Sequence, residues 1–165
     1  MSDPIPVRAH NLLCLLGYRG RGYDDRFVLE MTAVHRALAS APETLVEVRT
    51  APDRLCTACP HLRDRGCTLG GDRHETHMRA QDEDVAARLG LRAGDVVPWR
   101  EIVARVAASV RGADLPTICT TCPWLSLGWC ADGVERVRAG PASAALPPLA
   151  APLATSPVPD RRSPR

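Results

Sequence analysis

The feature that most constrains this chain is a cysteine pattern that occurs twice. Residues 55–67 and 118–130 both follow the pattern aliphatic-C-T-x-C-P-x-L-x4-C. The two residues between the paired cysteines allow a tight turn that directs both sulphurs at one ion or cluster, and thiolates suit iron–sulphur clusters, zinc and Cu(I). Two copies of so long a pattern strongly indicate two metal-binding half-sites. The predicted metal ligands in these segments are Cys56, Cys59, Cys67, Cys119, Cys122 and Cys130.

A fourth ligand is needed beside each set of three thiolates, because tetrahedral and cluster sites usually have four. The seventh cysteine, Cys14, is the first candidate, and His10 precedes it by one helical turn, so their side chains share a helix face. With two sites, Cys14 could complete one and His10 the other. With one site, the two C-x2-C pairs could supply all four ligands. The structural alternatives are a buried apolar role for Cys14 and a capping role for His10.

The chemistry of these thiols depends on the compartment. No stretch reaches the roughly 18 apolar residues of a membrane span, and residues 1–8 lack the features of a secretory signal. We therefore expect a cytoplasmic protein with no membrane partner, in which the cysteines are reduced and do not form a disulfide framework. The net charge is +2, and the basic residues are interleaved with acidic ones, so we expect no nucleic-acid partner.

Iron–sulphur is favoured over zinc as the bound group. A proline, Pro60 or Pro123, directly follows the second cysteine of each pair, and Cys-Pro often adjoins cluster-binding cysteines. Trp124 and Trp129 could form an apolar wall that shields a cluster from solvent. The alternative is a zinc-stabilised interaction module without redox activity. Thiol redox chemistry ranks third, because the C-x2-C pairs lack a βαβ context.

The remaining polar clusters suggest no reaction. The residues 74–77 (H-E-T-H) do not have the spacing of an H-E-x-x-H metalloprotease, and we expect a solvated helix face there. The acidic run 82–84 is expected to be an exposed face at a helix start. His61 lies inside the first cysteine segment, but Trp124 occupies the matching position of the second, so no shared ligand role is expected. No nucleophile–base arrangement indicates an enzyme, and a redox protein is the expected partner.

The rest of the sequence predicts a small, mainly α-helical single domain with at most a minor β element, whose loops carry the cysteines. Apolar residues recur at helical spacing from Phe27 to Leu38. From residue 139 the chain is rich in proline and alanine with no apolar period. We therefore predict a metal-binding domain over 1–138 and a disordered tail over 139–165. The predicted helices cover 9–17, 24–39, 72–89, a stretch after Pro98 and 134–137, and the one predicted strand covers 44–49.

Three separated blocks resemble a known family. They are residues 8–23 (RAHNLLCLLGYRGRGY), the two cysteine segments, and the L-x2-G-D-x2-P-W run at 91–99. Together they resemble a domain-of-unknown-function family of small bacterial and archaeal proteins described as possible iron–sulphur binders, over residues 7–133. The resemblance implies cysteine-ligated iron and no defined reaction or substrate. The ligands that it implies are Cys14, Cys56, Cys59, Cys67, Cys119, Cys122 and Cys130.

Overall fold

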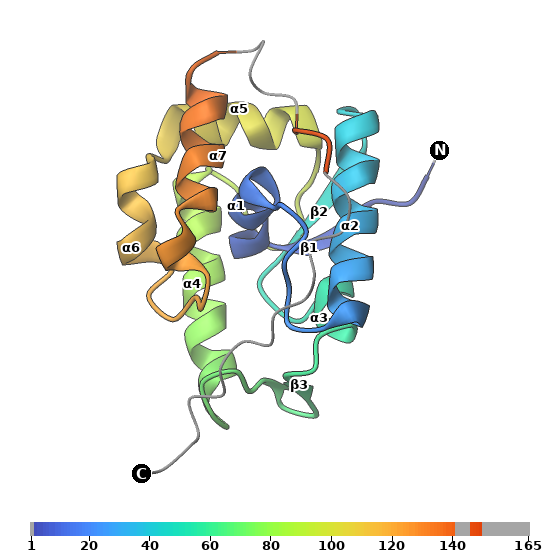
Figure 1. Cartoon of the computed structure of the whole chain (residues 1–165), viewed down its shortest axis with the longest axis vertical. Coiled ribbons are helices and arrows are strands. Elements are labelled where there is room, and N and C mark those ends of the chain that lie inside the picture. Colours follow the sequence, from blue (N-terminus) through green and yellow to red (C-terminus); the bar gives the residue numbers. More distant parts are fainter. Residues whose placement is uncertain (1, 141–145, 150–165) are drawn as a thin grey trace.

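The computed structural model describes residues 2–140 and 146–149 and is predominantly helical (Figure 1), which confirms the predicted class. None of the helices in these ranges is both long and apolar enough to span a bilayer. The helices are α1 (Ala9–Gly17), α2 (Asp25–Ser40), α3 (Arg54–Thr57), α4 (His74–Arg88), α5 (Trp99–Ser109), α6 (Leu115–Ile118) and α7 (Trp129–Arg138), with the 3-10 turns η1 (Gly112–Asp114) and η2 (Leu125–Leu127).

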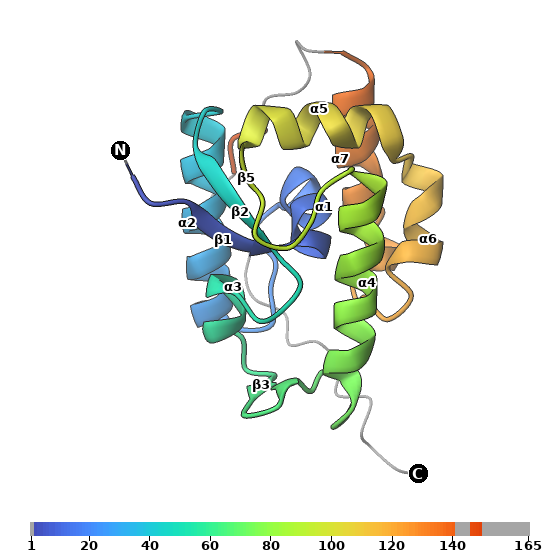
Figure 2. The ribbon, with the colours of Figure 1, turned by 180° about the vertical axis from the view of Figure 1, so that it is seen from behind.

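A small sheet of three strands lies beside these helices (Figure 2). Its central strand, β2 (Leu45–Arg49), was predicted; it pairs in parallel with β1 (Ile5–Arg8) and antiparallel with β5 (Val96–Pro98). The outer strands were not predicted, because each contains a proline, which cannot donate to a ladder and is tolerated at an edge. A separate two-stranded hairpin consists of β3 (Leu62–Arg63) and β4 (Gly66–Cys67).

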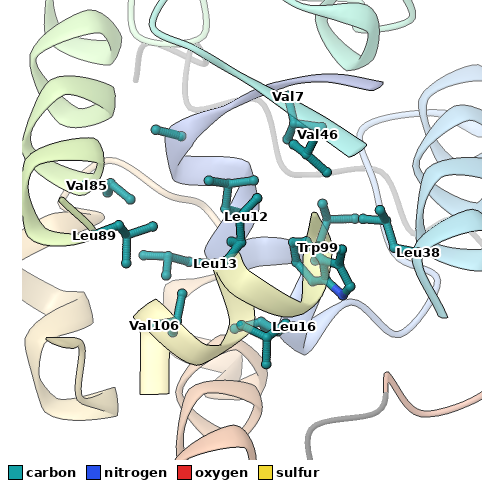
Figure 3. Close-up of a cluster of buried hydrophobic side chains, with 14 of the residues drawn as sticks. Val7, Leu12, Leu13, Leu16, Leu38, Val46, Val85, Leu89, Trp99 and Val106 are labelled. Carbon is teal, nitrogen blue, oxygen red and sulfur yellow. The ribbon is translucent and has the colours of Figure 1, made fainter. Parts of the chain in front are cut away.

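Helix α1 forms the centre of the core. In both overall views it lies between α2 and α4 (Figures 1 and 2). Its four leucines are buried at 0–1% exposure, as expected for a central helix, while His10, Asn11 and Cys14 of the same helix line a cavity. Figure 3 shows Leu12, Leu13 and Leu16 together with Val85 of α4 and Val106 of α5. Burying each leucine contributes about 1.5–3 kcal/mol.

The predicted amphipathic helices are confirmed. Asp24 caps α2, since its carboxylate accepts a 2.8 Å hydrogen bond from the Phe27 N–H. Phe27 and Leu38, at the two ends of the predicted stripe, are both buried. Helix α5 follows Pro98 as expected and buries its predicted apolar face, and α7 is longer than the predicted 134–137.

Helices α1 and α7 pack so closely that only glycine fits at their contact. A Cβ on Gly133 would lie 2.4 Å from the carbonyl oxygen of Leu16, and one on Gly17 would lie 2.6 Å from the Cα of Cys130. Both distances are far shorter than an ordinary van der Waals contact of 3.4–4 Å. This approach brings the first turn of α7 against α1 and sets the position of Cys130.

The predicted tail begins where α7 ends. Part of it is described: Leu146 is buried and Leu149 also packs against the core. Leu146 lines an apolar cavity of about 600 Å³ together with Leu38 of α2 and Val103 of α5. Residues 141–145 and 150–165 lie outside the described residues, so the boundary at residue 139 stays a prediction.

Candidate metal centre

A small cavity collects most of the predicted ligands. Its volume is about 80 Å³, far below the roughly 300–1,000 Å³ typical of organic ligands. An adjoining cavity of about 50 Å³ is lined by Cys14, Cys122 and Cys130. All seven cysteines are free thiols. Each of them lines one of these two neighbouring cavities. The larger cavity is lined by His10, Cys14, Cys56, Cys59, Cys67, Cys119 and Cys122.

The two matched segments begin with the same turn and then diverge. In each pair the N–H of the second cysteine bonds to the carbonyl of the first, at 2.9 Å for Cys59 and 3.1 Å for Cys122. The third cysteine then lies in different structures. Cys67 is in strand β4 of the hairpin, whereas Cys130 is in the first turn of helix α7. The sequence similarity therefore fixes the turn but not the surrounding structure.

Backbone donors point at the second sulphur of each pair. The N–H of His61 lies 3.5 Å from the Cys59 sulphur, and the N–H of the matching residue, Trp124, bonds to the Cys122 sulphur. The intervening prolines have no N–H, so the donors come from the next residues. Hydrogen bonds to thiolate sulphur stabilise its negative charge and help set the potential of a bound cluster.

Cys14 belongs with the second segment. Its thiol forms a hydrogen bond with Cys130, which raises the pKa of Cys14 and lowers that of Cys130. Cys119 and Cys122 are also close enough to act on the Cys14 charge. This grouping follows from the glycine contact between α1 and α7 and gives a set of four thiols, which we call the second set: Cys14, Cys119, Cys122 and Cys130.

The remaining three thiols, Cys56, Cys59 and Cys67, form the first set. Asp53 caps the short helix α3 by accepting a 2.9 Å hydrogen bond from the Cys56 N–H. Glu75 accepts a 2.8 Å hydrogen bond from the Cys67 N–H. Carboxylates that accept backbone hydrogen bonds thus fix two of the three cysteines.

Arg8 connects these carboxylates from its position at the end of β1. Its side chain is 1% exposed and forms a bidentate ion pair with Glu75, both N···O distances being 3.0 Å. Its Nε donates to Asp82 at 2.6 Å, and its backbone N–H donates to Asp53 at 2.5 Å. The first set is therefore held by a buried network of charges. Removing the Arg8 side chain would leave the buried carboxylates of Asp82 and Glu75 without their cationic partner.

Two sequence expectations about polar residues of α4 were wrong in part. Thr76, His77, Glu83 and Asp84 are exposed as expected, but three of their neighbours are not. Asp82 was expected on an exposed acidic face, yet it is 0% exposed in the middle of α4. Residues 74–77 were expected to be solvated, yet His74 is buried and Glu75 bonds to Arg8 and Cys67. The physical reason is a long-range partner: Arg8 lies 74 residues from Asp82 in the chain. Its positive charge compensates the buried carboxylates.

Asp82 also bonds to His10. Its Oδ1 accepts a 3.0 Å hydrogen bond from the His10 backbone N–H and lies 2.6 Å from the ring Nδ1. Burial alone would raise the pKa of Asp82, but the hydrogen bonds with His10 and the charge of Arg8 lower it overall. Asp82 is therefore an ionised acceptor that orients His10 at the cavity wall.

Tyr23 connects the two segments through ring contacts. Its ring centroid lies 4.8 Å from that of His61 and 4.5 Å from that of Trp124, which occupy matching positions. Burial raises the pKa of Tyr23, and the neighbouring thiols, including Cys59 and Cys122, raise it further. The phenol therefore stays neutral between the two sets.

The donor set fits a thiolate-ligated metal group. Burial raises the pKa of Cys59 to about 11 and that of Cys119 to about 12, so these thiols bind metal only by releasing protons. Within residues 2–140 and 146–149, however, no three His, Cys, Asp or Glu side chains are grouped closely enough to hold a single metal ion. The metal-binding role of the seven cysteines and His10 therefore stays a prediction.

Several site residues were missed by sequence reasoning. Asp53 could have been identified, since an aspartate three residues before a cysteine in a short helix has the position of an N-cap. Gly17 gave no signal beyond lying at the end of the predicted helix 9–17. Arg8 and Asp82 gave no local signal, because their burial depends on contacts between distant parts of the chain.

Comparison with known proteins identifies a family. The chain matches no curated protein and no solved structure. Residues 22–128 match the family described as "Protein of unknown function (DUF1284)". This match covers well over half of the chain and includes all of the first cysteine segment and most of the second. On this match, the chain belongs to this family of unknown function.

Proposed function

We propose that this protein binds two iron–sulphur centres and acts in electron transfer or in sensing redox state or iron. The observation that carries the proposal is the gathering of seven free thiols around two adjoining cavities. So many reduced thiols in so small a volume are unusual for a purely structural core, in which cysteine acts as a small apolar residue. The resemblance described above points to the same group.

The way the thiols associate supports two centres over one. The second set supplies four thiols, since Cys14 bonds to Cys130 and lies near Cys119 and Cys122. The first set supplies three, and Cys67 acts electrostatically on Cys59. Tyr23 and its two ring neighbours lie between the sets. Each set would hold one centre with its own surroundings.

Iron–sulphur is proposed in preference to zinc because a proline, Pro60 or Pro123, directly follows the second cysteine of each pair. The thiolates of a tetrahedral zinc site lie about 3.8 Å apart, because Zn–S bonds are about 2.3 Å. A cluster distributes its thiolates over several irons and so does not require three ligands around one ion. The absence of a single-ion group among the described residues is therefore compatible with a cluster.

The function class follows from what surrounds the cavities. A bound cluster supplies one-electron transfer. The chain's own residues exclude water through Tyr23, Phe27 and Trp124, which line the larger cavity, and they direct backbone N–H groups at sulphur. These features support a redox role with a protein partner and do not require a bound substrate.

Metal analysis tests the proposal most simply. Protein purified without oxygen should be brown and contain iron and acid-labile sulphide. The matched control is a variant with all seven cysteines replaced by serine, which should contain neither. Colourless protein with zinc and no sulphide would contradict the proposal and support the zinc-stabilised interaction module.

A further inference from the structure

We propose that Asp82 positions His10 as the nitrogen ligand of the centre held by Cys56, Cys59 and Cys67. The inference rests on the proposed function and specifies the ligands of one centre. That centre would have three thiolates and one imidazole, whereas the second set would have four thiolates.

The first argument is the environment of the His10 ring. Nδ1 lies 2.6 Å from Asp82 Oδ1, and the same oxygen accepts the His10 backbone N–H. An ionised carboxylate is only an acceptor, so Nδ1 carries the proton, and the neutral ring then has its lone pair on Nε2. Metal-ligating histidines commonly donate their other N–H to a carboxylate in this way. The ring is 19% exposed and lines the larger cavity.

The second argument is the rigidity of Asp82. Its other oxygen, Oδ2, accepts from Arg8 Nε at 2.6 Å, and the carboxylate is 0% exposed. Arg8 in turn is fixed by Glu75. Asp82 therefore has one geometry available to it, and this geometry holds both the backbone and the ring of His10. Such support goes beyond what capping the first turn of α1 requires.

The third argument assigns His10 to the first set. Asp82, which bonds to His10, also bonds to Arg8, and Arg8 bonds to Glu75, the acceptor of the Cys67 N–H. The Arg8 backbone N–H also bonds to Asp53, the acceptor of the Cys56 N–H. The pKa shifts of the thiols of the second set come instead from burial, backbone groups and one another. The second set already has four thiols through Cys14. The first set is the one that lacks a fourth ligand.

Histidine ligation would make the two centres chemically different. Replacing thiolate by neutral imidazole removes negative charge from a cluster and raises its potential. The centre with His10 would accept an electron more readily than the four-thiolate centre. The two centres would then define a direction for electron flow inside one small domain.

The test is nitrogen hyperfine spectroscopy on reduced, iron-loaded protein purified without oxygen. Wild type labelled with 15N only in histidine should show a coupling from directly bound imidazole. His10→Ala should lose this coupling. His10→Cys should keep iron and sulphide at the wild-type level while showing no nitrogen coupling, because a thiolate replaces the ring.

Asp82 is tested as a positioning residue. Asp82→Asn should weaken or shift the nitrogen coupling, and Asp82→Glu should restore it in part. The matched control is Asp84→Asn, which removes a carboxylate of the same helix that pairs with Arg88 at the surface and is 48% exposed. It should leave the coupling unchanged. Circular dichroism checks that each variant is folded, and the His10 variants decide the question if the Asp82 variants do not fold.

Each outcome has a defined meaning. Iron-loaded wild type without a histidine coupling, or with one that survives in His10→Ala, overturns this inference and leaves the proposed function intact. Wild type without iron and sulphide overturns the proposed function, and the inference fails with it.

Discussion

The two cysteine segments share a sequence pattern but have opposite surroundings. The first set is held by charges, with Arg8 at its centre and carboxylates fixing Cys56 and Cys67. The second set is held by close apolar packing, with Gly17 and Gly133 bringing α7 against α1. The same motif is thus supported once by electrostatics and once by shape.

This difference shows that the repeated cysteine motif specifies only its local turn. Both C-x2-C pairs form the same hydrogen-bonded turn. The position of the third cysteine depends on the wider fold, which places Cys67 in a hairpin and Cys130 in a helix. Two copies of one motif can therefore acquire different properties within one domain. The following predictions test this comparison.

Removing the charge at the centre of the first set should have the largest effect. Arg8→Met leaves Asp82 buried without its cationic partner, and we expect a loss of about 3–5 kcal/mol in the free energy of unfolding. Arg19→Met is the control near the second set, where Arg19 and Asp132 form an exposed pair that contributes under about 1 kcal/mol. Urea unfolding under anaerobic conditions measures both. Equal losses would contradict the assignment of a charge-supported first set.

Adding one methyl group at the α1–α7 contact should lower the free energy of unfolding nearly as much as Arg8→Met does. Alanine usually stabilises a helix relative to glycine by about 1 kcal/mol, but Gly133→Ala would force its Cβ against the Leu16 carbonyl oxygen. We expect a loss of about 3 kcal/mol. Gly94→Ala, whose added Cβ meets nothing within 4 Å but whose φ is +91°, should lose only about 1 kcal/mol from backbone strain. A stabilised Gly133→Ala would show that the contact is not tight.

The buried position of His35 predicts that the stability of the fold depends on pH. His35 is 1% exposed and packs against Tyr18, and neither ring nitrogen has a hydrogen-bond partner among the described residues. Burial, together with the charges of Arg136 and Arg36, lowers its pKa from 6.5 to about 4. The unfolded chain therefore binds a proton more readily, and stability falls as the pH drops from 6.5 toward 4.

Between pH 7.5 and pH 5 we expect His35 to lower the free energy of unfolding by about 2 kcal/mol, given its pKa values in the unfolded and folded states. His35→Leu should remove this part of the pH dependence while other groups titrate as before. The check is the free energy of unfolding of both proteins at the two pH values. Parallel pH profiles would show that His35 has the same pKa in the folded and the unfolded chain.

The smallest predicted effect concerns the link between the two sets. A double-mutant cycle with Tyr23→Leu and Trp124→Leu should give a coupling of about 1 kcal/mol, because the rings lie 4.5 Å apart. A parallel cycle with His61 should give a coupling of the same sign. Zero coupling in both cycles would mean that the sets are joined by other contacts.

Much of the fold could be predicted from local pattern. The central leucine-rich helix, the capped α2 and the apolar face of α5 all follow from residues within one or two turns. Strand β1 could not be predicted in the same way, since Pro6 argues against a strand until an edge position is known. Its pairing with β2 joins residues about 40 positions apart.

The candidate site could be predicted in its residue types but not in its assembly. The cysteine pattern identifies the thiols, and helical spacing places His10 and Cys14 on one face. Which set each residue joins depends on the α1–α7 contact and on the Arg8–Asp82 pair. Both are long-range contacts. An aspartate in the middle of a helix gives no sign of its burial until its partner is known.

The most direct test of the account is the iron and sulphide content of two matched single variants, Cys59→Ala and Cys122→Ala, purified without oxygen beside wild type. The account predicts that each variant is folded and retains about half of the iron and sulphide, because each loses one of two independent centres. Retention of the full content by both variants, or loss of all iron by both, would contradict two separate centres.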